Sequence, residues 1–175
     1  MTSYTSFAIA CVYLGFAPMA ADSTPSSLEE ALAMRAVHAT SDREMGERTN
    51  PLVVSEVNLR AGLIVYRNNC LMCHGAADGR GSIIAKGFYV RAPQFATDGA
   101  EDDPEGATYW KIHHGIRFTA MPAFRNGLTD TQMWQVTMFV KRMDRLPKDV
   151  DLAWKSTKRI DGAKAPSQTP MGMNL

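Results

Sequence analysis

The stretch Cys70-Leu71-Met72-Cys73-His74 decides how this chain is interpreted. Two cysteines are separated by two residues, and a histidine directly follows the second one. The remaining cysteine, Cys11, lies near the amino terminus, so the three cysteines do not form a disulfide framework. Apolar residues recur at helical spacing from Ser55 to Asn68, which predicts a helix that ends where the motif begins.

The spacing C-x-x-C-H is that of the attachment site of a c-type haem. Two thiols on one turn can each form a thioether with one of two vinyl groups on the same porphyrin edge, and the next histidine can then bind the iron. A zinc site would need a second ligand pair at matching spacing, which the adjacent His113 and His114 do not provide. A thioredoxin-like site would need a preceding strand. We therefore expect Cys70 and Cys73 to attach one haem c and His74 to bind its iron.

Met121 is the expected second axial ligand. It lies 47 residues after His74 in the loop-like stretch Thr119-Ala120-Met121-Pro122. Pro122 favours an extended conformation at Met121, which lets its side chain project from the backbone. The other methionines have simpler interpretations, as part of the motif, of a helix core or of the tail: Met72; Met133, Met138 and Met143; Met171 and Met173.

A further helix is predicted before Met121, with Asp103 as N-cap, Pro104 at the first helical position and Gly115 as its end. His113 and His114 close this helix and are expected to be ordinary polar residues of its last turn rather than ligands. Two interpretations stay open for Tyr109 and Trp110, which lie earlier in the same helix. They could donate hydrogen bonds to a haem propionate, or they could fill the core around the ring.

Two other features concern helix packing. Gly62 lies inside the first predicted helix, where glycine costs about 1 kcal/mol relative to alanine, so it is either a tolerated residue or the site of a close helix crossing. The last clear helix begins at Thr129, which forms a capping box with Gln132, and is expected to end near Leu146-Pro147.

The first 21 residues contain no charged side chain, and the apolar run from Phe7 to Ala20 is too short for a comfortable membrane span. We interpret residues 1–21 as a secretory signal peptide, although no lysine or arginine precedes the apolar run; an uncleaved anchor and a wrongly assigned start are the alternatives. Cys11 is expected to be a cysteine within an apolar segment rather than a lipid-attachment site.

Residues 22–50 are expected to form a polar N-terminal extension, with a short helix from Leu28 to His38 and a linker over 39–50. Residues 51–147 are expected to form the compact domain. Residues 148–175 are expected to be a polar tail with a short helix around 152–156 and disorder over 162–175. With 19 basic and 18 acidic residues the net charge is +1, which gives no reason to expect a nucleic-acid partner.

The order of these elements resembles a class I, single-haem cytochrome c. It is similar in particular to the bacterial periplasmic group that shares its pattern with cytochrome c6 and with cbb3-oxidase-associated cytochromes. The resemblance covers about residues 51–147. It is carried by the helix with Gly62 and Tyr66, the motif Cys70 to Gly75, the string Tyr109 to Ile116, and the stretch Thr119 to Phe124 with Met121-Pro122.

This resemblance implies an all-α fold of three to five helices wrapped around one covalently attached haem. The first and last helices would cross, with Gly62 and Tyr66 facing Trp134 or Phe139. It also implies that a proline carbonyl, which we assign to Pro93, accepts a hydrogen bond from Nδ1 of the haem-ligating histidine.

An iron held by His74 and Met121 has no free coordination place, so the sequence predicts a periplasmic one-electron carrier rather than an enzyme with catalytic residues. Its partner would be a redox protein, a dehydrogenase or a terminal oxidase, and no organic substrate is expected. Membrane association would require an uncleaved signal or a membrane-bound partner. The alternative is a haem sensor or a peroxidase-like enzyme with a labile sixth ligand, for which Arg117 and His114 would be the nearby polar groups.

Overall fold

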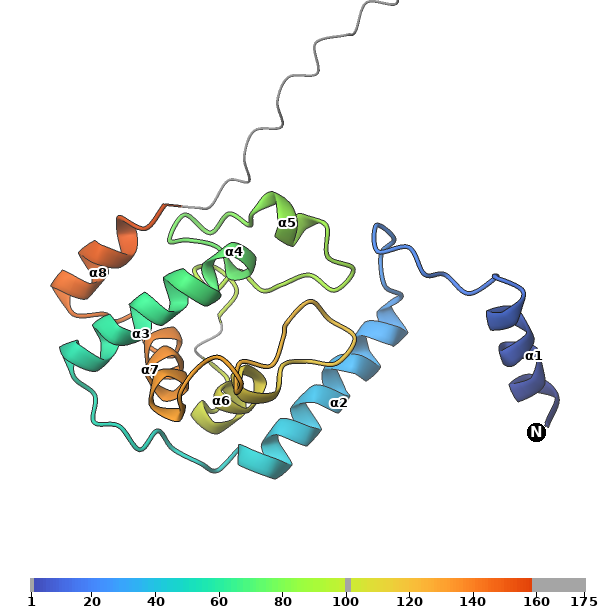
Figure 1. Ribbon diagram of the computed structural model, residues 1–175, viewed down its shortest axis with the longest axis horizontal. Helices are drawn as coiled ribbons and strands as arrows, with labels where there is room; N and C mark the ends of the chain where they lie inside the picture. Colours follow the sequence, from blue (N-terminus) through green and yellow to red (C-terminus); the bar gives the residue numbers. More distant parts are fainter. Residues whose placement is uncertain (1, 100–101, 159–175) are drawn as a thin grey trace, which may run out of the picture.

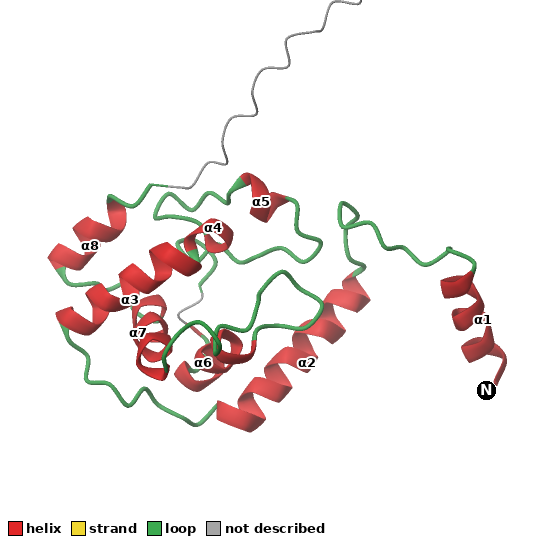
Figure 2. Ribbon diagram, in the orientation of Figure 1, coloured by secondary structure: helices red, strands yellow, loops and turns green. Residues whose placement is uncertain are grey.

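The computed structural model describes residues 2–99 and 102–158, and this part of the chain contains helices and no strand (Figure 2). Five helices lie within residues 51–147, so the predicted all-α fold of three to five helices is confirmed, with further helices on either side (Figure 1). The helices are α1 Thr2–Tyr13, α2 Ser27–Met45, α3 Glu56–Asn69, α4 Leu71–His74, α5 Ile83–Lys86, α6 Glu105–His114, α7 Asp130–Val140 and α8 Lys148–Lys155.

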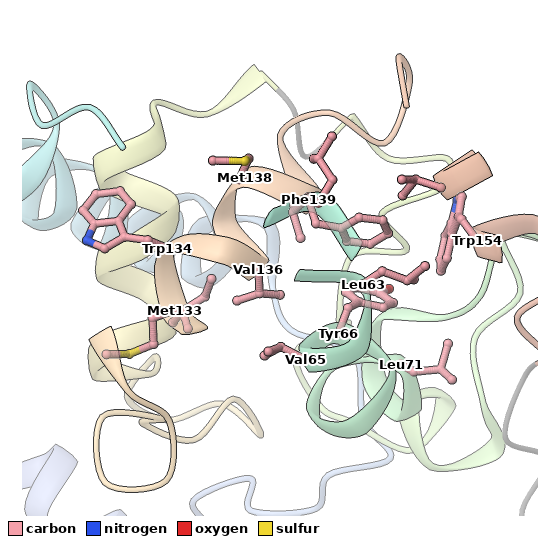
Figure 3. Close-up of a cluster of buried hydrophobic side chains, with 14 of the residues drawn as sticks. Leu63, Val65, Tyr66, Leu71, Met133, Trp134, Val136, Met138, Phe139 and Trp154 are labelled. Atoms are coloured by element: carbon pink, nitrogen blue, oxygen red, sulfur yellow. The ribbon is translucent and has the colours of Figure 1, made fainter. Parts of the chain in front are cut away.

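The crossing of α3 and α7 forms the centre of the molecule. A Cβ added to Gly62 would overlap the carbonyl oxygen of Gln135 and lie 2.8 Å from Cβ of Phe139, so only glycine allows the two helices this approach. Tyr66 is fully buried one turn later on α3, and its ring centroid lies 5.5 Å from that of Phe139 (Figure 3). The predicted crossing with Phe139 is confirmed, whereas Trp134 stacks on Tyr109 instead.

The predicted capping box of α7 is confirmed, because the Thr129 hydroxyl accepts from the Gln132 N–H and the Gln132 side chain accepts from the Thr129 N–H. The predicted end near Leu146-Pro147 is wrong. The helix ends at Val140, where backbone hydrogen bonds shorten to the i→i−3 type and the chain continues as turns over 141–145.

The N-terminal extension differs most from its prediction. Helix α2 does not end near His38 but continues to Met45 through much of the expected linker. It packs against α6, where a Cβ added to Gly106 would overlap the carbonyl oxygen of Met45. Asn50 then fastens the chain after α2, since its N–H donates to Glu105 at 2.9 Å and its Nδ2 donates to the Trp134 carbonyl at 2.8 Å.

Helix α8 begins earlier than predicted, at Lys148 rather than near 152, and buries Val150 and Trp154. Trp154 meets the ring of Tyr66 edge-on with centroids 5.4 Å apart, so α8 closes the far side of the α3–α7 crossing. The expected disorder over 162–175, and the tail positions Met171 and Met173, lie outside the described residues.

Helix α1 lies apart from the other helices in Figure 1 and carries Cys11, with several of its apolar side chains exposed. Among the described residues, no helix combines the length and the apolar character that a membrane crossing requires.

Candidate haem site

The predicted attachment motif forms one helical turn directly after α3. Cys70 ends α3, where its N–H donates to Tyr66, and it also precedes α4, where its carbonyl accepts from the N–H groups of Cys73 at 3.0 Å and His74 at 2.9 Å. Residues three apart on such a turn lie on one face, which is what two thioethers to one porphyrin edge require. Met72, between them, is 42% exposed, as expected for a residue that points elsewhere.

Both motif cysteines have free thiols, and both residues are partly buried. Burial raises the pKa of the Cys70 thiol to about 12 and also raises the pKa of Cys73. Such thiols stay protonated at neutral pH and are therefore poor nucleophiles and poor metal ligands without a reaction partner. No group of three or more potential metal ligands among His, Cys, Asp and Glu occurs in the described part of the chain.

The imidazole of His74 is held by the loop that follows α5. Its Nδ1 lies 2.9 Å from the carbonyl oxygen of Pro93, which confirms the expected partner. Since a carbonyl only accepts, Nδ1 carries the proton and Nε2 keeps a free lone pair. Burial lowers the pKa of His74, so the ring is neutral at neutral pH and suited to bind a metal. The Phe95 ring stacks on the imidazole with centroids 4.1 Å apart.

The turn around His74 is fixed by hydrogen bonds to three successive carbonyl groups. The Cys73 carbonyl accepts from Gln94 Nε2 at 3.1 Å, the His74 carbonyl from the Phe95 N–H at 3.3 Å, and the Gly75 carbonyl from the Tyr66 hydroxyl at 2.7 Å. Tyr66 was expected only at the helix crossing and Gln94 was not expected at all. Their roles depend on carbonyl positions that the sequence pattern does not reveal.

Met121 lies in the loop between α6 and α7, and this loop is bound to the end of α6. The Met121 carbonyl accepts from the Ile116 N–H at 3.1 Å, and the Met121 N–H donates to the Thr119 hydroxyl at 3.1 Å. Gly115 adopts φ +67°, and a Cβ there would lie 2.7 Å from the Met121 carbonyl oxygen. Met121 is half-buried and packs, like Cys70, against the hydrophobic core.

The polar groups of α6 are engaged by the protein. The Tyr109 hydroxyl donates to Asp130, and Trp110 Nε1 donates to Glu44 of α2 at 2.7 Å, so neither atom is directed to a propionate. His113 and His114 belong to the last turn, as expected, with the His113 ring stacked on Tyr109. The helix begins one residue later than predicted, because Pro104 occupies the N-cap and Asp103 instead pairs with Lys111 at 2.7 Å.

Residues 57–140 match the family model described as "Cytochrome C oxidase, cbb3-type, subunit III". This segment belongs to the class I c-type cytochromes. The matched range begins in α3 and ends with α7, so it contains the helix crossing, the attachment turn and the Met121 loop. No curated protein matches the chain.

Membership of this family implies that the cytochrome domain carries haem c and transfers electrons. The residues fit that group, because the attachment turn offers two free thiols, and the Pro93 hydrogen bond leaves Nε2 of His74 available. Two helices outside the matched range pack against it, since α2 contacts α6 and Trp154 of α8 contacts Tyr66 at the α3–α7 crossing.

Proposed function

We propose that this protein is a periplasmic one-electron carrier in which Cys70 and Cys73 hold one haem c and His74 and Met121 are the two axial ligands. Bound haem c would supply an iron that alternates between the ferric and ferrous states. The hydrogen bond from His74 Nδ1 to the Pro93 carbonyl is the observation that carries the proposal, because it sets the tautomer that a metal-binding histidine needs.

Each residue has a separate task in this proposal. The two cysteines fix the position of the ring edge, and His74 holds the iron through a ring whose orientation the protein determines. Met121, on a loop that is bound to α6, supplies a thioether that favours the reduced state and raises the potential. With both axial places filled, neither oxygen nor a substrate gains access, so the chain acts as a carrier rather than as an enzyme.

The proposal also covers the rest of the chain. Residues 1–21 would be the secretory signal that delivers the protein to the periplasm, where electron transfer would take place with a dehydrogenase or a terminal oxidase. Residues 22–50 and the stretch from 148 onward would be additions to the electron-carrying domain. The docking of α2 on α6 and of Trp154 on Tyr66 supports additions that stabilise this domain.

Optical spectra of the mature, haem-loaded protein test the ligand set. We expect a low-spin spectrum with a weak far-red sulfur-to-iron band, unchanged by carbon monoxide. Met121→Ala should remove this band and make the reduced protein bind carbon monoxide, whereas the control Met72→Ala should keep the native spectrum, since Met72 is exposed. A wild-type protein that binds carbon monoxide would instead favour the sensor or peroxidase-like alternative.

Covalent attachment needs its own test. After extraction with acid acetone the wild-type protein should retain haem, and the double variant Cys70→Ser/Cys73→Ser should release it. Retention of haem by the double variant would contradict the roles proposed for the two cysteines.

A further inference from the structure

Gln94 is a buried residue of the loop that follows α5, and its side chain contacts the attachment turn. It is 7% exposed, and its Nε2 donates to the carbonyls of Cys73 at 3.1 Å and Ala92 at 2.9 Å. One amide group thus links the residue before His74 to the residue before Pro93. A surface amide would exchange freely with water, whereas this one has two fixed partners inside the protein.

Two glycines make room for this amide. A Cβ on Gly75 would overlap Oε1 of Gln94, and a Cβ on Gly81 would lie 3.3 Å from the same atom. Oε1 has no hydrogen-bond partner, so the two bonds from Nε2 determine which way the amide faces. The side chain therefore occupies a space that fits it in one orientation.

The peptide between Pro93 and Gln94 connects His74 to a carboxylate. Its carbonyl accepts from Nδ1 of His74 at 2.9 Å, and its N–H donates to Oδ2 of Asp98 at 2.8 Å. A peptide unit is planar and trans, so its C=O and N–H point in opposite directions. The carboxylate that holds the N–H consequently aims the carbonyl at His74.

Asp98 is itself held in place. Its Oδ2 pairs with Nη1 of Arg91 at 2.7 Å, its Oδ1 accepts from the Thr97 hydroxyl at 3.1 Å, and its side chain is 24% exposed. These bonds, with that of Arg91 as the largest influence, hold the pKa of Asp98 below its usual value, so it is charged at neutral pH. A charged acceptor strengthens its own hydrogen bond and polarises the peptide beyond it.

We propose that Gln94 and Asp98 are positioning residues for the imidazole of His74, acting through the Pro93–Gln94 peptide. Gln94 fixes the place of this peptide relative to the attachment turn, and Asp98 fixes its direction and increases the electron density on its carbonyl. A stronger acceptor at Nδ1 makes the imidazole more basic, which favours ferric iron. The inference rests on the proposed function, in which His74 is an axial ligand.

The test uses the reduced haem-loaded protein and follows hydrogen exchange of the His74 Nδ1 proton by NMR, together with the reduction potential. Asp98→Ala and Gln94→Met should each accelerate exchange of this proton by about tenfold or more, an effect of the same order as the loss in metal affinity or activity when partners of metal-bound histidines are removed. The potential should rise in Asp98→Ala, with a tenfold change in the redox equilibrium corresponding to about 59 mV. Asp98→Asn keeps an acceptor oxygen without the charge. Exchange of the Nδ1 proton should therefore be slow in this variant, and its reduction potential should lie between those of the wild type and Asp98→Ala.

Matched controls separate positioning from general effects. Gln135→Met makes the same change in α7, where the Gln135 side chain donates a hydrogen bond to Asn58 of α3. When variants of equal global stability are compared, this control should leave the exchange rate of the His74 Nδ1 proton unchanged. Asp78→Asn removes a carboxylate near the motif that does not contact the Pro93–Gln94 peptide, and should shift the potential less than Asp98→Asn.

The outcomes distinguish this inference from the proposed function. A wild-type protein whose His74 does not bind iron would overturn both. In another outcome His74 binds the iron in the wild-type protein, but Nδ1 exchange and the reduction potential of Asp98→Ala and Gln94→Met match those of their controls. This result would overturn the positioning role and leave the proposed function intact.

Discussion

The hydroxyl of Tyr66 donates a hydrogen bond to the carbonyl oxygen of Gly75, 2.7 Å away and fully inside the protein. Tyr66 lies at the α3–α7 crossing, and Gly75 directly follows His74, so this bond connects the buried helix crossing to the attachment turn. Burial raises the pKa of the Tyr66 hydroxyl, so it stays protonated and remains a donor across the physiological range.

Tyr66→Phe should lower the free energy of unfolding by about 1–3 kcal/mol, because it leaves the Gly75 carbonyl buried without a donor while the aromatic packing is kept. Urea unfolding of the haem-loaded protein measures this change. The matched control is Tyr89→Phe, which loses an exposed hydrogen bond to Glu29 and should lower the free energy of unfolding far less than Tyr66→Phe. Equal losses in the two variants would show that the buried bond has no special weight.

Gly62→Ala should destabilise the protein by about 3 kcal/mol, at the upper end of the range for overpacking, since the added methyl overlaps the backbone of α7. Haem incorporation during expression should fall with it. Gly127→Ala serves as control, because a Cβ there would lie 4.0 Å from its nearest neighbour, the carbonyl oxygen of Phe124. The stability of the control should change by less than about 1 kcal/mol, and an equally stable Gly62→Ala variant would contradict the crossing described here.

The sequence allowed prediction of those features that depend on local spacing or on the family pattern. The attachment motif, the capping box at Thr129, the helix crossing at Gly62 and the Pro93 carbonyl could all be expected before the structure. The length of α2 could not be, because the stretch from Ala39 to Asn50 has no apolar periodicity, and its helical part packs on Gly106, about 60 residues later in the chain.

Gln94 and Asp98 were also beyond prediction, for a different reason. Both act on the orientation of one peptide group, and a peptide orientation leaves no trace in the spacing of side chains. The partner of Trp110 could not be predicted either. Its indole N–H donates to Glu44 rather than to a propionate, and Glu44 lies in the part of α2 beyond the predicted helix end.

Gly106→Ala should detach α2 from α6 while the α3–α7 crossing remains folded. The added methyl would overlap the Met45 carbonyl, and α2 is held otherwise by few bonds, of which the Trp110–Glu44 pair is exposed. Hydrogen exchange of the α2 amides should accelerate by about tenfold or more, with little change in the amides of α3 and α7. Glu44→Gln, which weakens the exposed Trp110 hydrogen bond and removes an exposed ion pair with Arg43, should change α2 exchange far less. Slow exchange of α2 in Gly106→Ala would contradict its docking on α6.

His113 should make the stability of the protein fall as the pH drops below 6.5, the ordinary pKa of histidine. Its Nδ1 is buried without a hydrogen-bond partner, and burial, with a smaller effect of His114, lowers its pKa from the ordinary value of 6.5. Below 6.5 the unfolded chain therefore binds a proton more readily than the folded protein, so stability falls as the pH drops through this window. Carboxylates with a lowered pKa, such as Asp98, lose their contribution to stability only at more acidic pH, below their usual pKa of 3.8.

Urea unfolding of the haem-loaded protein at pH 7.5 and pH 5.5 measures this dependence. His113→Phe keeps a ring that can stack on Tyr109 but cannot take up a proton, so it should lose less stability than the wild type between these two pH values. The comparison is made within each protein, which removes any constant difference caused by the substitution itself. An identical loss in both proteins would show that His113 does not titrate differently in the folded and unfolded states, and the buried Nδ1 would then have no energetic consequence.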